Sequence, residues 1–148
     1  MRKVEALTIS RPGRDIGKTF VLTEMPADQG ERWAIRALLA FASAGGELPQ
    51  GVTPQSGMAG LAEIGIFSVL GRIPEERVMP LLDEMFQCVK YKHKEGAPLQ
   101  AIISGDGSQI EEIVTRMDLR AALFKLHLDF TQAADTPTTV SLRSVGQS

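Results

Sequence analysis

The chain of 148 residues is poor in the side chains that build catalytic and metal sites. It has one cysteine, Cys88, two histidines and only 5% aromatic residues. A single cysteine excludes an intrachain disulfide and suits a reducing compartment, so we expect a cytoplasmic protein. Cys88 and His93 fall on opposite faces of a predicted strand and cannot chelate together there. We therefore expect no metal, no cofactor and no Cys–His nucleophile pair.

Long hydrophobic runs and a strong net charge are missing as well. The longest apolar stretch, Ile64–Leu70, is interrupted by Ser68 and is much shorter than the roughly 20 residues of a membrane span. Met1–Ser10 is positively charged but lacks the apolar segment of a secretory signal. The net charge of −2 gives no general attraction to nucleic acid or to an anionic membrane. We expect a soluble protein with neither partner.

What the sequence does contain is aliphatic side chains, mostly at helical spacing. Hydrophobic residues make up 43% of the chain, which is enough to bury a core in one domain of this length. We expect that domain to span residues 1–130. Residues 131–148 are rich in Thr, Ser and Gln and lack periodicity, so they are expected to form a flexible C-terminal tail.

Two segments of the chain are typical of β-hairpins. Val4–Ile9 and Thr19–Leu22 are rich in β-branched residues and are separated by the turn-forming segment Arg11–Gly17. In the middle of the chain, Val89–Lys94 and Leu99–Ile103 alternate between apolar and polar residues. The sequence leaves open whether the two hairpins pair with each other.

The rest of the chain indicates about four helices. Pro26 is expected to open a helix that ends at Gly45, and Gly57–Leu70 is expected to form a second. A proline inside a helix removes a hydrogen bond and clashes with the preceding turn, so a third helix should restart at Pro80 after a short turn. The last helix is expected from about Ile110 onward. The predicted fold class is α+β, mainly helical, with the two hairpins.

The last helix carries more apolar surface than one core contact needs. The set that follows the 3.6-residue period, and is expected to face the core, is Ile110, Ile113, Val114, Met117, Ala121, Phe124 and Leu128. A second set widens this apolar surface and is expected to bind a partner or a second copy of the chain: Leu119, Leu123, Leu126 and Phe130.

Other candidate chemistry has simpler explanations. The acidic pairs, Glu75/Glu76, Asp83/Glu84 and Glu111/Glu112, lie in predicted first helical turns, where the helix dipole favours negative charge. Gly105–Ser108 could hold an anion on its backbone amides, although it lacks the Lys-Ser/Thr of a phosphate-binding loop. His127 is expected to be capped or to face solvent. We expect no catalytic residue in this chain.

Three segments resemble one known family. Lys18–Ala44, Val78–Val89 and Glu111–Phe130 are similar to the tail assembly chaperones of phages and prophages with long tails. The resemblance covers most of the chain apart from its C-terminal tail and consists of packing residues without a catalytic signature. It implies a non-enzymatic protein of the bacterial cytoplasm that binds the tape measure protein and tail tube subunits and associates with itself.

Two other functions remain open on the sequence. A minor structural or completion protein of the tail would have similar sequence features but would stay in the mature virion. A small enzyme or regulator would use the turn at Gly105–Ser108 as its anion site. No residue role can be transferred from the family, so the partner-binding residues above rest on periodicity alone.

Overall fold

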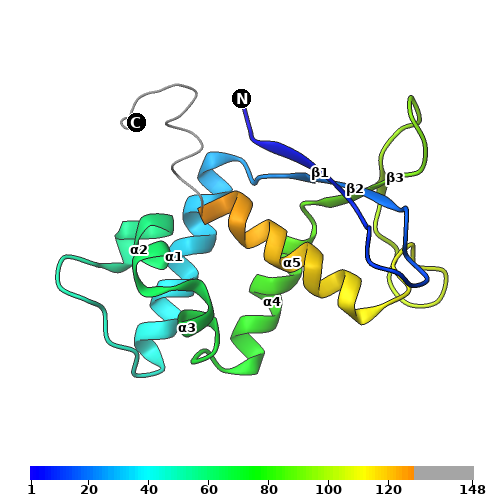
Figure 1. Ribbon diagram of the computed structural model, residues 1–148. Coiled ribbons are helices and arrows are strands. Elements are labelled where there is room, and N and C mark those ends of the chain that lie inside the picture. Colours follow the sequence, from blue (N-terminus) through cyan, green and yellow to red (C-terminus); the bar gives the residue numbers. More distant parts are fainter. Residues whose placement is uncertain (129–148) are drawn as a thin grey trace.

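Four antiparallel strands form one sheet, beside which the helices pack (Figure 1). The computed structural model describes residues 1–128. The strands are β1 (Val4–Thr8), β2 (Thr19–Thr23), β3 (Val89–Lys92) and β4 (Gln100–Ala101), in the spatial order β1-β2-β3-β4. Both predicted hairpins are confirmed, and β2 joins them by pairing with β3 in a register that places Leu22 opposite Val89.

The helical part confirms the α+β class. Within residues 1–128 the helices are α1 (Ala27–Ser43), the 3-10 turn η1 (Pro54–Ser56), α2 (Gly57–Ile64), α3 (Ile66–Leu70), α4 (Glu75–Phe86) and α5 (Ile113–Leu128). In Figure 1, α5 crosses in front of α4 between the sheet and the other helices. None of the helices described is both long and apolar enough to cross a membrane.

Two helices differ from the prediction. Gly57–Leu70 is not one helix, because Gly65 takes a φ of 105°, a left-handed conformation that ends α2 and lets α3 start in a new direction. Conversely, Pro80 does not begin a helix. It lies inside α4, which starts at Glu75. The helix loses only the hydrogen bond to the carbonyl of Glu76, and both residues are exposed to water.

The core lies where the sheet, α1, α4 and α5 meet. Phe20 and Leu22 of β2 and Trp33 of α1 are completely buried. The indole Nε1–H of Trp33 donates a 2.8 Å hydrogen bond to the carbonyl oxygen of Leu81 in α4, so this ring is both packed and polar-satisfied. Near them, Gly60 lets α2 approach α1, because a Cβ there would stand 3.2 Å from the Leu38 side chain.

The two edges of the sheet differ. At the β4 edge, the side-chain amide of Gln109 accepts a hydrogen bond from the Ile103 amide and donates one to the carbonyl oxygen of Ala101, at 2.9 and 3.0 Å. Gln109 therefore pairs with the outer backbone groups of this edge. At the other edge, β1 is exposed along most of its length, and its backbone pairs only with β2 among the strands described.

Two expectations fall on residues that the structure does not describe. The predicted partner-binding residue Phe130 and the predicted tail at 131–148 both lie outside residues 1–128. The proposed domain boundary at residue 130 lies there too.

Candidate interaction surface

The loop between β1 and β2 fastens the N-terminus of α5 through one buried carboxylate. Asp15 is 1% exposed and accepts hydrogen bonds from the backbone amides of Glu111 and Glu112, both within 3.1 Å. It also accepts a 2.6 Å bond from the Thr115 hydroxyl and a 2.9 Å bond from Lys18 Nζ. Asp15 thus acts as a helix cap supplied from a distant part of the chain.

Hydrogen bonding decides the charge of this carboxylate. Burial alone would raise the pKa of Asp15, but the hydrogen bonds from Lys18, Thr115 and the two amides outweigh it and lower the pKa to about 2. Lys18 also donates to Glu111 at 3.0 Å, and its pKa is raised because these carboxylates outweigh the effect of burial. The cluster is therefore a fully paired ionic network.

Two further ion pairs join the same loop to α5. Arg11 forms a bidentate pair with Asp118, the shortest contact being 2.9 Å. Arg14 lies 3.7 Å from Glu112. Both arginines are more than half exposed, so each pair contributes little to stability.

This network bears on the proposed anion loop. The turn at Gly105–Ser108 does not lead directly into α5, which begins five residues later, and the amides ahead of that helix bind Asp15. An anion would have to displace a buried carboxylate to reach them. Within residues 1–128, no three His, Cys, Asp or Glu side chains cluster in a way that could hold a metal ion.

The acidic pairs are placed differently from the prediction in two of three cases. Glu75 and Glu76 do lie in the first turn of α4. Asp83 and Glu84 lie well inside that helix instead, because it begins five residues earlier than expected. The Glu111/Glu112 pair precedes α5 and contacts the basic residues of the β1–β2 loop.

His127 is buried and bonded to a carbonyl of the last turns of α5, so of the two expectations, capped or solvent-facing, the second is wrong. It is 7% exposed, and its Nε2 accepts a 3.0 Å hydrogen bond from the Met25 amide. Nδ1 must therefore carry the proton and donate it to the Leu123 carbonyl oxygen, 2.9 Å away. This neutral tautomer ties the end of α5 to the segment before α1.

Acidification is expected to destabilise the protein through His127. Burial lowers the pKa of this imidazole despite its bond to the Leu123 carbonyl and the nearby charge of Glu24, with Lys3 acting in the same direction as burial. A lowered folded-state pKa means that the stability is fully present above the ordinary value of 6.5 and is lost as the pH falls below it.

Urea unfolding measured from neutral to mildly acid pH checks this expectation. The His127→Gln variant should be less stable at neutral pH but should show a flatter pH profile. The exposed His93 remains as an internal control. Parallel profiles for the variant and the wild type would contradict the assignment.

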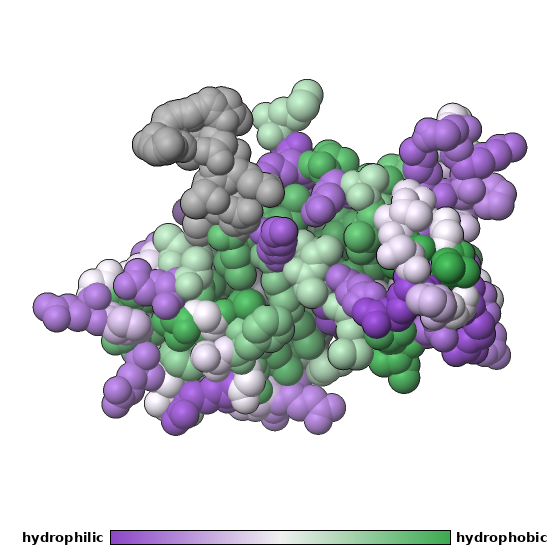
Figure 2. All heavy atoms as spheres, viewed as in Figure 1, coloured by the Kyte–Doolittle hydropathy of each residue, from purple (hydrophilic) through white to green (hydrophobic). Residues whose placement is uncertain are grey.

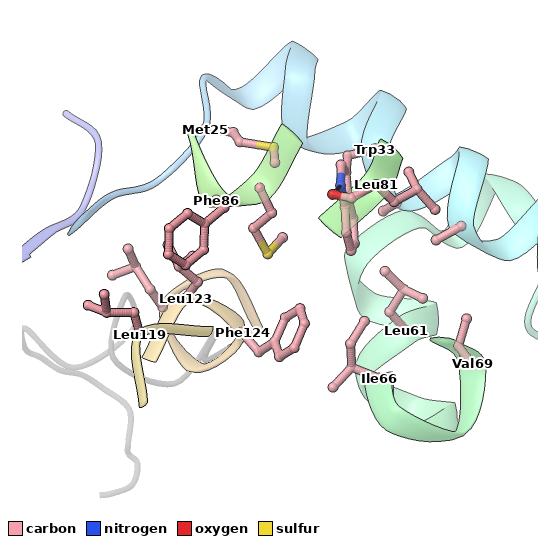
Figure 3. Packing of buried hydrophobic residues seen from close by; sticks show 14 of the residues in the cluster. Met25, Trp33, Leu61, Ile66, Val69, Leu81, Phe86, Leu119, Leu123 and Phe124 are labelled. Atoms are coloured by element: carbon pink, nitrogen blue, oxygen red, sulfur yellow. Dashed lines mark hydrogen bonds between the residues drawn. The ribbon is translucent and has the colours of Figure 1, made fainter. Parts of the chain in front are cut away.

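The buried face of α5 is the one expected to bind a partner. Leu119, Leu123 and Leu126 are 0, 1 and 5% exposed and belong to the core. Figure 3 shows Leu119 and Leu123 beside Phe86 of α4. The prediction that these three leucines form a partner-binding surface is therefore wrong for the folded chain, because no partner can reach them without unfolding α5.

The set expected to lie in the core is divided: Ile110 and Phe124 are buried as expected, Val114 and Leu128 are half-buried, and the other three residues are exposed. Ile113 and Met117 are 80% and 62% exposed, and Ala121, one turn further along α5, is exposed too. We call these three residues the α5 stripe. Figure 2 shows mostly hydrophobic residues in the middle of the face where α5 and α3 lie in Figure 1, with hydrophilic residues around them.

Phe67 of α3 extends the α5 stripe onto a second helix. It is 71% exposed, and its ring meets that of Phe124 edge-on with the centroids 5.6 Å apart. Phe124 follows Ala121 by three positions, so the contact brings Phe67 alongside the stripe. On its other side Phe67 borders a hollow of about 680 Å³ that Phe41 and Arg72 also line. Sequence periodicity gave no sign of this residue.

Comparison with known proteins identified no relative of this chain. No family model, no curated protein and no solved structure matches this chain. Any functional conclusion therefore depends on the resemblance of the three sequence segments and on the surface just described.

Proposed function

We propose that this chain is a phage tail assembly chaperone that binds the tape measure protein and recruits tail tube subunits in the bacterial cytoplasm. The observation that carries the proposal is the exposed α5 stripe with Phe67 beside it. An apolar surface that spans two helices suits an amphipathic helix of a partner, which can bury its own apolar face there. The resemblance of Lys18–Ala44, Val78–Val89 and Glu111–Phe130 supplies the identity of that partner.

The proposed chaperone works by covering surface. The tape measure protein is long and helical, and its apolar faces would aggregate before the tube polymerises around them. A shallow, exposed surface allows reversible binding, so that tube subunits can replace the chaperone. Self-association, which the family resemblance also implies, would let several copies coat one partner.

Co-expression with the tape measure protein of the same locus tests this function. The wild-type chain should co-purify with that protein and keep it soluble. The double variant Ile113→Gln/Met117→Gln should bind at least about tenfold more weakly, because covering one such side chain contributes roughly 1.5–3 kcal/mol. Leu39→Gln is the matched control, since Leu39 is 48% exposed on α1 and lies outside the stripe.

Mass spectrometry of purified virions separates the chaperone from the alternative structural protein. A chaperone should be absent from mature particles, whereas a minor tail component should be present in them. A tape measure protein that is soluble alone and forms no complex with this chain would overturn the proposed function.

A further inference from the structure

Two arginines of α5 stack on one aromatic ring of α4. The guanidinium carbon of Arg116 lies 4.1 Å from the centroid of the Phe86 ring, and that of Arg120 lies 5.0 Å from it. Phe86 is 7% exposed, so it is held rigidly in the core and fixes both cations at its surface. Arg120 is further held by a 3.2 Å hydrogen bond that it donates to the carbonyl oxygen of Leu82.

Neither of these two cations forms an ion pair within residues 1–128. Among residues 1–128, no Asp or Glu lies within ion-pair distance of Arg116 or Arg120, although every arginine of the β1–β2 loop has an acidic partner. Burial and the adjacent charge of Arg116 both lower the pKa of Arg120, and Asp83 compensates only in part. A bound anion would relieve this repulsion.

A hollow of about 630 Å³ opens beside Arg116. Arg116 and Lys90 supply its positive charge and Asp83 its negative charge. Its apolar lining comes from Phe86, Val89, Ala101 and Ile102, and Gln87 and Ser104 add polar groups. The hollow therefore offers a cation and an apolar floor next to each other, a combination suited to a carboxylate that neighbours an apolar side chain.

The arginine pair also borders the α5 stripe. Arg116 follows Ile113 by three positions and Arg120 follows Met117 by three, so each arginine lies next to a stripe residue on the surface of the helix. A helix bound along the stripe would pass over Arg116 and Arg120 where α5 meets α4. Acidic residues on this side of the bound helix would therefore be favoured and basic residues disfavoured.

We propose that Arg116 and Lys90, which line the hollow, and Arg120, which shares the Phe86 ring with Arg116, form a carboxylate-binding site that selects partner helices carrying Asp or Glu beside their apolar face. This inference rests on the proposed function only where it identifies the partner as the tape measure protein. The site itself would bind any amphipathic helix with acidic residues beside its apolar face. A protein segment fits better than nucleic acid, because apolar side chains lie beside the cations of the hollow and the chain has a net charge of −2.

A matched peptide pair tests the site without the tape measure protein. Two helical peptides of roughly 20 residues share one leucine face and differ only in carrying Glu or Lys beside it. The Glu peptide should bind at least about tenfold more tightly at low salt, as expected for desolvated charge pairs, and should shift the Nε–H resonances of both arginines in NMR spectra. Added salt should reduce this preference.

Glutamine variants locate the effect. In Arg116→Gln/Arg120→Gln the preference for the Glu peptide should fall to about twofold or less, whereas Lys94→Gln, which removes an exposed cation between β3 and β4, should leave it unchanged. If the double variant fails to fold, the arginine resonances of the wild type decide the question. Equal binding of the two peptides, or no binding of either, would overturn the proposal.

Two further outcomes keep this site separate from the proposed function. A short single-stranded DNA that shifts the arginine resonances when the Glu peptide does not would also overturn it. A clear preference for the Glu peptide, together with no complex with the tape measure protein, would overturn the chaperone function and leave the carboxylate site standing.

Discussion

Replacing Asp15 by alanine is expected to lower the free energy of unfolding by about 3–5 kcal/mol, the range for breaking a buried charge network. The substitution leaves the amides of Glu111 and Glu112 without their acceptor and the Thr115 hydroxyl without its partner. It also removes one of the two carboxylates that pair with Lys18 and leaves Glu111 as the other. Because these groups connect the β1–β2 loop to α5, their loss should also weaken the packing of α5 against the core.

Chemical denaturation of Asp15→Ala and of Asp106→Ala measures this effect. Asp106 is exposed in the turn before α5, so its removal should change the stability by less than about 0.5 kcal/mol. A small effect at Asp15 would show that water replaces the carboxylate in the folded protein.

The pH dependence gives a second check on Asp15. The hydrogen bonds that outweigh burial lower its pKa from 3.8 to about 2. A depressed folded-state pKa means that the stabilisation is present above pH 3.8 and is lost as the pH falls toward 2. The Asp15→Asn variant, which cannot ionise, should lack this component of acid unfolding.

Truncating Leu119 to alanine should cost about 2–5 kcal/mol, whereas the same change at Met117 should cost less than about 1 kcal/mol. Leu119 is completely buried and Met117 is 62% exposed. The two residues lie two positions apart on opposite faces of one helix and have similar helix propensity, so the comparison isolates burial. The result would show which face of α5 the folded chain uses as core.

Thermal and urea unfolding of both variants provide the measurement. Comparable losses for the two variants would contradict the placement of α5, since the helix would then have to be turned so that Met117 is packed. The Met117→Ala variant should in addition weaken partner binding, which Leu119→Ala can affect only through unfolding.

The sequence predicted most elements because their signals are local. The hairpin strands and α1 are set by alternation, by turn residues and by Pro26 at the helix start, and the structure places each within one or two residues. Gly65 and Pro80 were harder to predict. Whether Gly65 interrupts a helix depends on whether the chain can change direction at that point. Whether Pro80 starts a helix or lies inside one depends on how many residues before it are already helical.

The orientation of α5 could not be predicted, for a physical reason. Its charged residues do not mark one side as polar, because Arg116 and Arg120 lie on one flank of the stripe and Asp118 and Lys125 on the other. Both remaining faces are apolar, so periodicity alone does not distinguish them. The deciding contact is Asp15 with Thr115, which joins residues 100 positions apart in sequence.

The unequal edges of the sheet limit how this protein can associate. Beside β4 the side-chain amide of Gln109 occupies the Ala101 carbonyl and the Ile103 amide, whereas the outer side of β1 pairs with no strand within residues 1–128. A sheet that is sealed on one side can accept a single additional strand and then has no free edge of its own to pass on. Strand addition between copies through β1 would therefore stop at a pair and would not continue into a fibre.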